Sequence, residues 1–478
     1  MNEAIPFTAA GACVAAPLLA AGALAMPGGE RNPRLHAVVG LAVSLIAAVV
    51  LAGWQHRAAA GPLAWGLELA GGRVVVVDGL TAILLPYVAI VGLAVAVAAP
   101  RRVLDGPVAA RMLVSIAATM ALMLTAHPLV LVVLWTVTAI PTWIATRSVS
   151  GGRPVARVYA LAMILSTACI AAGTALMVID PPWLLDRGEA GVAGGWLVAV
   201  AVMIRKGIVP FHSWYPALFS AAPFSAALTA TMPQVASYTA IRLLVGHADG
   251  VAPELVVLSQ AAFVTAAYGA SLALVQRDVR GLVGTLAMSQ SALVLAGLAG
   301  TLPLELCGAL AIWISSGLAL TGIGLVAWSL ESRSGSVRLE EFGGRYGSAP
   351  GLAAFFLLFG LATLGLPGTF SFVADDLIVA GSLSDNLHAG VLVILATALA
   401  GIAMMRGWFR IFGGQAKSHG PRQPILLREQ VAFLGLLAIL FGLGLSPGPA
   451  VNALERVATD LLAMSHLSST VTPPGGHP

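Results

Sequence analysis

Long apolar runs constrain this chain more than any other feature, and they recur along almost its whole length. A helix needs roughly 20 apolar residues to cross a bilayer, whereas strands of a membrane barrel show only a weak alternation over about ten residues. Runs such as 79–99 and 254–275 are long enough for helices and lack that alternation. The sequence therefore predicts an all-α polytopic membrane protein.

Composition excludes a soluble fold and limits the number of domains. Only 10% of the 478 residues are charged, against about 25% in soluble domains. At roughly 20 residues a crossing, the chain has room for membrane helices and none for a large soluble domain. We predict a single integral membrane domain over 1–465 and a disordered tail over 466–478, where the sequence is HLSSTVTPPGGHP from residue 466.

Charges, prolines and glycines divide the apolar runs into about fourteen predicted membrane helices. In chain order they are segments one to fourteen: 4–26, 35–53, 79–99, 108–126, 128–147, 156–178, 195–220, 222–245, 254–275, 281–300, 304–330, 350–380, 388–409 and 429–447. The first segment has no basic stretch before it, so we expect a retained helix and not a cleaved signal peptide. Between segments two and three, the run GGRVVVVDG predicts a short hairpin outside the membrane.

Basic residues are distributed unequally between the two faces of the membrane. Of the 25 Lys and Arg residues, 18 lie in or beside loops that follow odd-numbered segments, and five lie on the opposite side. Cytoplasmic loops of membrane proteins carry an excess of Lys and Arg. We therefore predict a multi-pass protein of the cell (inner or plasma) membrane with both termini non-cytoplasmic. The same asymmetry accounts for the basic net charge without a nucleic-acid partner.

Two of the predicted helices are interrupted. Segment seven contains Pro210, and segment twelve contains the sequence GLPG at 365–368. Interrupted helices at corresponding places in two halves of a transporter point to inverted repeats around a conduction site at mid-membrane. We predict two inverted five-helix repeats, segments four to eight (108–245) and nine to thirteen (254–410).

Lysine is the rarest charged residue here, and one of the two lysines lies within the membrane. Lys206 is near the centre of segment seven, four residues before Pro210, whereas Lys417 lies in a predicted loop. An ionisable group at bilayer depth is costly and is by default a functional hypothesis, so we predict Lys206 as the central proton carrier. The alternative is a lysine that snorkels or pairs with a neighbouring subunit. Arg205, about 100° around the helix, is expected to face a partner or a phospholipid head group.

Further candidates for the proton pathway are polar residues in or beside the segments. His212 is a candidate because histidine as a residue type can exchange protons near neutral pH. Asp375 and Asp376 point about 100° apart, so at most one of them faces an internal channel. For these aspartates the alternative is a solvated helix end, and for hydroxyl groups it is a bond to the carbonyl four residues earlier. The predicted hydroxyl and amide positions are Thr136, Thr229, Gln290 and Ser315, within a wider polar set that includes Thr138, Ser225, Thr231, Gln234, Ser289, Ser291 and Ser316.

No catalytic, metal-binding or redox chemistry is predicted for this chain. Its three cysteines, Cys13, Cys169 and Cys307, all lie in apolar segments, where small buried thiols are expected. Their positions suggest neither a disulfide nor a metal site, and no cofactor is predicted.

Three stretches of the chain resemble a known family. They are RKGIVPFHSWYPALFSAAPFSAALTATM at 205–232, VQRDVRGLVGTLAMSQ at 275–290, and FGGRYGSAP with GLPGTFSFVADDL within 342–377. The chain resembles the proton-conducting antiporter-like family, which includes the large membrane subunits of respiratory complex I and of multisubunit sodium/proton antiporters. The resemblance covers about 110–410 and implies fourteen helices with a central lysine at Lys206.

The chain departs from that family at several expected site positions. The family's key glutamate follows a tryptophan in segment five, where this chain has Thr136 after Trp135. The usual histidine of segment eight aligns with Thr229, and the usual lysine of segment eleven has no counterpart within 310–322. We therefore expect Lys206 to lack the carboxylate that its relatives provide.

These departures make the chain similar to the membrane component of two-component systems that accumulate inorganic carbon. That resemblance implies a hetero-oligomeric complex with a large zinc-containing, carbonic-anhydrase-like subunit. The favoured hypothesis is a subunit that conducts protons or sodium ions and couples their gradient to bicarbonate or CO2 uptake. The alternatives are a proton-pumping subunit of a complex I-like oxidoreductase or sodium/proton antiporter, and a structural membrane anchor whose channel has decayed.

Overall fold

The computed structural model describes residues 4–26, 32–58, 63–69, 72–100, 103–179, 188–245, 252–299, 302–385, 387–415 and 423–470, almost all of them helical. Lys417 and residues 471–478 lie outside this part. The elements are α1 (Ala4–Ala25), α2 (Pro33–Ala58), β1 (Leu63–Leu69), β2 (Gly72–Val77), α3 (Gly79–Ala98), α4 (Gly106–Met123), α5 (Pro128–Ser148), α6 (Arg153–Ile179), α7 (Glu189–Lys206), α8 (Trp214–Ala221), α9 (Phe224–Thr231), α10 (Val235–Leu243), α11 (Pro253–Leu274), α12 (Val279–Ala296), η2 (Gly297–Ala299), α13 (Pro303–Ser334), α14 (Pro350–Ala362), α15 (Phe370–Asp385), α16 (Leu387–Phe412), α17 (Leu427–Leu445) and α18 (Gly448–Thr470).

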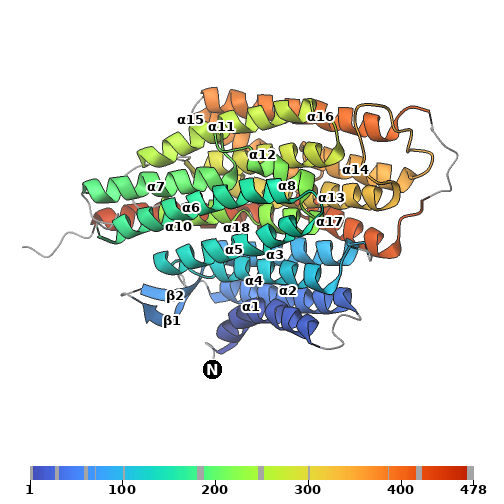
Figure 1. The fold of residues 1–478 in the computed structure, drawn as a ribbon. Coiled ribbons are helices and arrows are strands. Elements are labelled where there is room, and N and C mark those ends of the chain that lie inside the picture. Colours follow the sequence, from blue (N-terminus) through green and yellow to red (C-terminus); the bar gives the residue numbers. More distant parts are fainter. Residues whose placement is uncertain are drawn as a thin grey trace, which may run out of the picture.

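The helices run side by side, with α1 and α2 along one edge of the molecule and α11, α15 and α16 along the opposite edge (Figure 1). Helices α12 and α13 lie inside the bundle, and almost every residue of their apolar stretches is buried. Outer helices such as α1, α6 and α16 bury only a minority of the residues in their apolar stretches, and they expose large apolar side chains, including Leu161. Apolar surface of this extent requires a non-aqueous surrounding, so the packing confirms the predicted polytopic membrane fold.

The fourteen predicted crossings stay a prediction, because three of the fourteen segments are each divided between two shorter helices. Among the described residues, 11 helices are long and apolar enough to span a membrane. The divided segments correspond to α7 with α8, α9 with α10, and α14 with α15. The interruptions predicted in segments seven and twelve are therefore confirmed. The break between α9 and α10 was not predicted, and the two-repeat organisation stays a prediction.

The predicted hairpin is present between α2 and α3. Strands β1 and β2 pair antiparallel, with Leu63 opposite Val77 and Leu69 opposite Gly72. The chain leaves β2 and enters α3 through Asp78, whose carboxylate accepts a 2.9 Å hydrogen bond from the Thr81 backbone N–H. A side chain that caps a helix in this way fixes where the helix begins.

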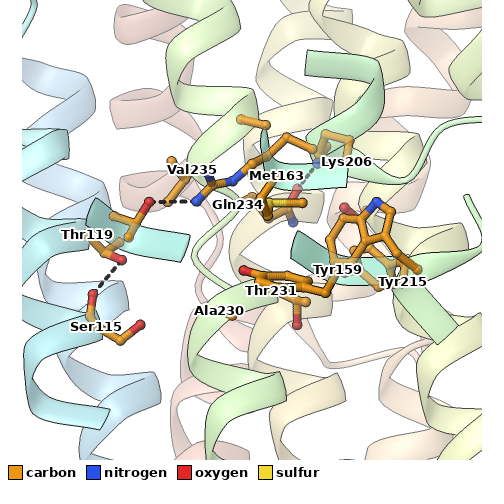
Figure 2. A pocket seen from close by; sticks show the side chains of 15 residues that line it. Ser115, Thr119, Tyr159, Met163, Lys206, Tyr215, Ala230, Thr231, Gln234 and Val235 are labelled. Atoms are coloured by element: carbon orange, nitrogen blue, oxygen red, sulfur yellow. Dashed lines mark hydrogen bonds between the residues drawn. The ribbon is translucent and has the colours of Figure 1, made fainter. Parts of the chain in front are cut away.

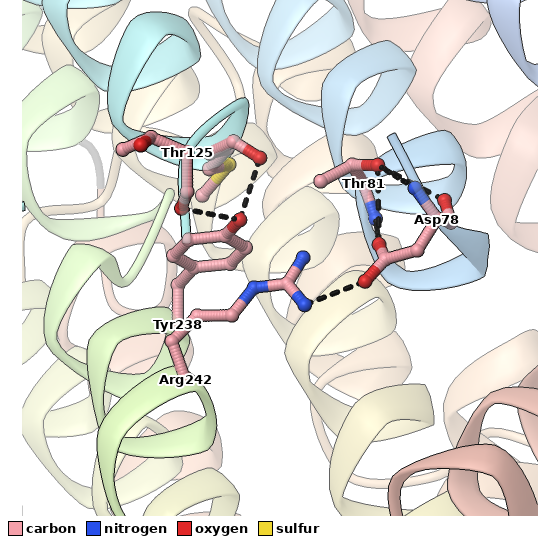
Figure 3. A network of polar contacts seen from close by, with 6 residues as sticks. Asp78, Thr81, Thr125, Tyr238 and Arg242 are labelled. Carbon is pink, nitrogen blue, oxygen red and sulfur yellow. Dashed lines mark hydrogen bonds and ion pairs between the residues drawn. The ribbon is translucent and has the colours of Figure 1, made fainter. Parts of the chain in front are cut away.

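Asp78 also joins the N-terminal helices to α10 through a buried ion pair. Arg242 Nη1 lies 2.5 Å from Asp78 Oδ2, and the two side chains are 7% and 15% exposed (Figure 3). Burial raises the pKa of Asp78, but the Arg242 guanidinium and the hydrogen bonds from Thr81 outweigh it, so this pKa lies below its ordinary value. The Arg242 guanidinium lies 4.8 Å from the centre of the Tyr238 ring, and Tyr238 Oη donates to the Met123 carbonyl oxygen at 2.7 Å. This network fixes α10 against the ends of α3 and α4.

The last two helices return to the middle of the bundle. Both α17 and α18 contact α3 and α13 (Figure 1). Helix α18 continues past residue 466 to Thr470, so the first residues of the predicted tail are helical. The C-terminal part of the chain thus packs against two helices that also contact α9.

Candidate functional site

Close packing of α6 and α7 sets the position of Lys206. A Cβ built on Gly173 would lie 2.7 Å from the Gly194 carbonyl oxygen, and one built on Gly194 would lie equally close to the Gly173 carbonyl oxygen. Small residues at such contacts allow membrane helices to approach closely. Helix α7 ends directly at Lys206, because Gly207 takes a left-handed conformation with φ 67°.

The end of α7 confirms the prediction of a break before Pro210 and shows how its backbone is satisfied. The Ile204 carbonyl oxygen accepts hydrogen bonds from Trp214 Nε1 at 2.8 Å and from the Gly207 N–H at 3.2 Å. Backbone that leaves the helical pattern at membrane depth needs such partners within the protein. The helix can therefore end in the middle of the bundle with Lys206 on its last turn.

A second break, between α9 and α10, faces the first one. Gln234 has φ 52°, the only positive φ among the described non-glycine residues, and such a conformation costs of order 1–3 kcal/mol. The carbonyl oxygen of Met232, in the same break, accepts a 2.7 Å hydrogen bond from Tyr87 Oη on α3. A Cβ on Gly317 of α13 would lie 1.8 Å from Tyr87 Oη, so α13 holds this hydroxyl in place only because it has glycine there.

The two breaks bring Lys206 and Gln234 together. Lys206 Nζ donates a hydrogen bond to Gln234 Oε1, and the two residues are 3% and 6% exposed (Figure 2). Beside them lies a cavity of about 30 Å³. This volume admits at least one water molecule. The cavity is lined by Ser115, Thr119, Thr138, Tyr159, Met163, Arg205, Lys206, Trp214, Tyr215, Ala230, Thr231, Gln234, Val235, Ala236 and Ser291.

Arg205 faces helix α5, contrary to the expectation that it faces a partner or a lipid. Its Nη1 donates to the Trp135 carbonyl oxygen at 2.7 Å, and its Nη2 donates to Thr138 Oγ1 at 2.6 Å. The guanidinium also lies 4.8 Å from the centre of the Trp135 ring. Arg205 thus holds α7 against α5 with a fixed positive charge beside the cavity.

No acidic residue lines the cavity around Lys206 in the described part of the chain. Thr136 is half-buried, and its hydroxyl donates to the Val132 carbonyl oxygen of its own helix at 3.1 Å. It is not among the lining residues, so the structure does not bring Thr136 and Lys206 together. The acceptor that Lys206 has is a neutral amide, Gln234.

Ser115 joins this cavity to a second, smaller one. Its hydroxyl oxygen is buried and has no hydrogen-bond partner among the described residues. Ser115 also lines a cavity of about 10 Å³ that includes Arg111, Thr142 and Thr229. Arg111 lies near the start of α4 and donates to Ser148 Oγ, the last residue of α5, at 3.1 Å. Polar groups therefore extend from Lys206 toward the predicted cytoplasmic ends of α4 and α5.

Besides Lys206, Thr229 is the one predicted pathway position that lies beside this route, and several members of the wider polar set line the two cavities as well: Thr138, Ser225, Thr231, Gln234 and Ser291. The Thr229 hydroxyl donates to the Ser225 carbonyl oxygen at 2.7 Å, which is the local bond given as the alternative. Gln290 on α12 and Ser315 on α13 are buried, but neither lines the Lys206 cavity. His212 lies beside the exposed Tyr268 on α11, with its Nε2 3.3 Å from Tyr268 Oη, and does not line that cavity either.

The two aspartates belong to the break between α14 and α15. Asp376 is exposed, whereas Asp375 is half-buried. A Cβ on Gly365, which has φ 75°, would lie 2.7 Å from Asp375 Oδ2. That oxygen is buried and has no hydrogen-bond partner in the described structure. As the spacing predicts, only one of the pair turns inward, and it turns toward the interruption.

Two contributors to the site were missed by sequence reasoning. Gln234 was noted only as one polar residue of many, and Tyr87 on α3 was not noted at all. The available signal for Gln234 was Pro233 within an apolar segment, which allows either a kink or a break. Nothing in the local sequence of Tyr87 indicates that its hydroxyl donates to the Met232 carbonyl oxygen in the break after α9. These groups can hold water and let the amine exchange a proton through water and hydroxyl groups, while the amide of Gln234 orients the amine as a hydrogen-bond acceptor.

The chain matches a family model described as NADH:quinone oxidoreductase/Mrp antiporter, transmembrane, over residues 158–401, just over half of the chain. NADH-quinone oxidoreductase subunit M of Pseudomonas aeruginosa is 28% identical over 264 residues, which cover 54% of this chain and 51% of the relative. This chain thus spans about half the length of the curated relatives that it matches.

Solved structures show the same fold over almost the whole chain. A chain of respiratory complex I from Thermus thermophilus superposes with a TM-score of 0.83 at 21% identity, covering 95% of this chain and 99% of that one. A chain of the Mrp complex from Dietzia sp. DQ12-45-1b superposes with a TM-score of 0.85 at 19% identity, covering 98% and 99%. At these identities the likeness concerns the fold.

Proposed function

Because the chain belongs to the NADH:quinone oxidoreductase/Mrp antiporter transmembrane family, we propose that it is a proton-translocating membrane subunit of a multisubunit complex. The observation that carries the proposal is the buried amine of Lys206, which lies where two broken helices meet and beside a cavity of water size. An ionisable group so far from solvent is costly to keep, and structural packing does not require it. A proton-exchange role accounts for it.

In this proposal Lys206 Nζ gains and loses the transported proton. Gln234 Oε1 accepts the hydrogen bond from the protonated amine of Lys206. The left-handed backbone conformation of Gln234 fixes the direction of that bond. The unpartnered hydroxyl of Ser115 offers a water binding position between the two cavities. A proton leaving Lys206 would follow this route toward Arg111 at the predicted cytoplasmic face.

We propose that the ion movement is coupled to other subunits, as in the complexes that contain its relatives. A complex I-like oxidoreductase or a sodium/proton antiporter fits the family better than inorganic-carbon uptake does, because the comparisons include relatives of the first two kinds. In our proposal both termini are non-cytoplasmic, and the loops rich in arginine face the cytoplasm.

One observation favours a second candidate, inorganic-carbon uptake with a carbonic-anhydrase-like partner. Thr136 stands where the family resemblance implies a glutamate, and no acidic residue lines the Lys206 cavity in the described structure. A lysine without a carboxylate partner would conduct without the charge pair expected in a redox-driven pump. Under the third alternative, a structural anchor, no conduction is expected.

Proton flux into vesicles that contain the purified complex tests the proposal. Replacing Lys206 with Met keeps the length of the side chain and removes the amine, and Lys417→Met is the matched control because Lys417 is the other lysine of the chain. We expect flux driven by a pH gradient to fall at least tenfold in Lys206→Met and to stay unchanged in Lys417→Met. Equal flux in both variants and the wild type would refute proton translocation through Lys206.

The proteins that co-purify decide between the coupled processes. Flavin and iron–sulfur absorption bands in the purified complex would identify a redox-driven pump. Sodium-dependent proton release without such bands would identify an antiporter. A zinc-containing partner with CO2 hydration activity would instead support inorganic-carbon uptake.

A further inference from the structure

Three arginines surround an open cavity at the junction of α5 and α6. The cavity has a volume of about 310 Å³ and is lined by Trp143, Arg147, Arg153, Ala156 and Arg157. Arg147, Arg153 and Arg157 are exposed, and none of the three forms an ion pair with a residue that the structure describes. Trp143 forms one wall, with the Arg147 guanidinium 5.3 Å from its ring centre.

The placement of these charges is unfavourable for the helices themselves. Arg153 is the first residue of α6, where the helix dipole disfavours a positive charge. Arg157 follows four residues later, and like charges at this spacing repel each other along a helix. A bound anion would relieve both effects, and guanidinium groups form paired hydrogen bonds with phosphate.

Apolar side chains continue from the arginines into the membrane on the same helix faces. On α6 the positions four and seven residues after Arg157 are Leu161 and Ile164, which are 68% and 67% exposed. On α5 the positions three and seven residues before Arg147 are Ile144 and Ile140, also exposed. Residues at these spacings share one helix face, so each face is charged at the membrane surface and apolar below it.

We propose that this cavity, the α5–α6 cavity, binds the head group of an anionic glycerophospholipid. The three guanidinium groups hold the phosphate, and the acyl chains lie along the exposed apolar faces of α5 and α6. A free phosphate ion would use the arginines but not the apolar faces, which is why the surface favours a lipid. By the arginine distribution, the lipid belongs to the predicted cytoplasmic leaflet, where basic pockets at helix ends bind anionic head groups.

The test compares lipid binding to the purified complex and to two double variants. Arg153→Gln with Arg157→Gln removes two charges from the cavity. Arg57→Gln with Arg456→Gln removes two exposed charges elsewhere and is the matched control. In native mass spectra recorded after exchange into phosphatidylglycerol, we expect the cavity variant to retain one lipid fewer per chain than the wild type and the control. Its affinity should fall roughly 25-fold, because each of the two basic groups near an anionic lipid contributes roughly fivefold.

Thermal unfolding in different lipids tests the α5–α6 cavity by a second measurement. It also distinguishes a lipid head group from a free phosphate ion as the bound anion. The wild type and the control should unfold at a higher midpoint temperature in dioleoyl phosphatidylglycerol than in phosphatidylcholine. The difference between the two lipids should be smaller for the cavity variant. Equal midpoints of all three proteins in phosphatidylcholine show that the variants fold. Equal lipid retention in both double variants would overturn the proposal. So would equal protection of the wild type by soluble glycerol phosphate, because a free anion would then suffice.

Discussion

Replacing Gly317 with alanine tests whether the break in segment eight is held from outside by Tyr87. A Cβ at position 317 would lie 1.8 Å from Tyr87 Oη and 2.8 Å from Tyr87 Cζ, so the ring must move. Its hydroxyl then loses the 2.7 Å hydrogen bond to the Met232 carbonyl oxygen. Because Met232 lies two residues before Gln234, we expect the acceptor of Lys206 to be displaced as well.

The expected cost follows from two effects. Extra volume in a packed interior costs about 1–3 kcal/mol, and the lost hydrogen bond adds about 0.5–1.5 kcal/mol. Relative to a control Gly→Ala substitution that gains the same helix propensity, Gly317→Ala should therefore lower the free energy of unfolding by about 1.5–4.5 kcal/mol. In a Tyr87→Phe background the oxygen is absent and the hydrogen bond is already lost, although Cζ remains close. The same substitution should then cost less by at least about 0.5–1.5 kcal/mol, a coupling between the two sites.

Denaturant titration in mixed micelles measures the unfolding free energies, and vesicle flux measures the effect on the site. Gly435→Ala on α17 is the matched control, because a Cβ there has no neighbour within 4 Å. Both substitutions gain the same helix propensity, so their difference isolates the contact with Tyr87. The reasoning would be refuted if Gly317→Ala were as stable as the control, or if its cost were the same with and without the Tyr87 hydroxyl.

Two further predictions concern the neighbours of the site. Ser115→Val removes the hydroxyl between the two cavities, so proton flux should fall severalfold with little change in thermal stability. The control Ser271→Val, at an exposed position on α11, should leave proton flux unchanged. Asp78→Asn leaves the buried Arg242 charge unpaired and should cost about 3–5 kcal/mol in denaturant titration, and adding Arg242→Leu should recover part of that loss. A cost below about 1 kcal/mol for Asp78→Asn would contradict the view that this ion pair is buried and structural.

Much of the fold was predictable because hydropathy alone determines where a membrane helix can lie. The β-branched run before Asp78 predicted the hairpin, and Pro210 and the GLPG sequence predicted two of the three breaks. The break at Met232 to Gln234 escaped, although Pro233 is there, because a proline alone allows a kinked, continuous helix. What makes it a break is the left-handed Gln234 and the hydrogen bond from Tyr87, and both depend on tertiary packing.

The sequence led to the central residue of the candidate site and to several polar groups that line its cavity, but it did not indicate which of these groups contact one another. The rarity of lysine led to Lys206, but its acceptor and the direction of Arg205 depend on how α5, α9 and α10 pack. His212 is a candidate only by its residue type, which carries no information about position, and the structure places it beside the exposed Tyr268. Composition and spacing thus identify which group is unusual, and packing determines which groups it meets.

The geometry of the breaks also bears on the alternative that Lys206 merely snorkels. A snorkelling lysine extends along the protein surface to reach the head groups, which requires an exposed side chain. Lys206 is 3% exposed, ends its helix inside the bundle and donates to Gln234 on another interrupted helix. Pairing with a neighbouring subunit is excluded for the same reason, because groups of this chain already enclose the amine. Non-helical backbone is tolerated at membrane depth only where protein or a water-filled cavity covers it. A chain that maintains two facing breaks and a strained residue around one amine therefore bears a structural cost that packing alone does not explain, and the proposed proton exchange at Lys206 would account for it.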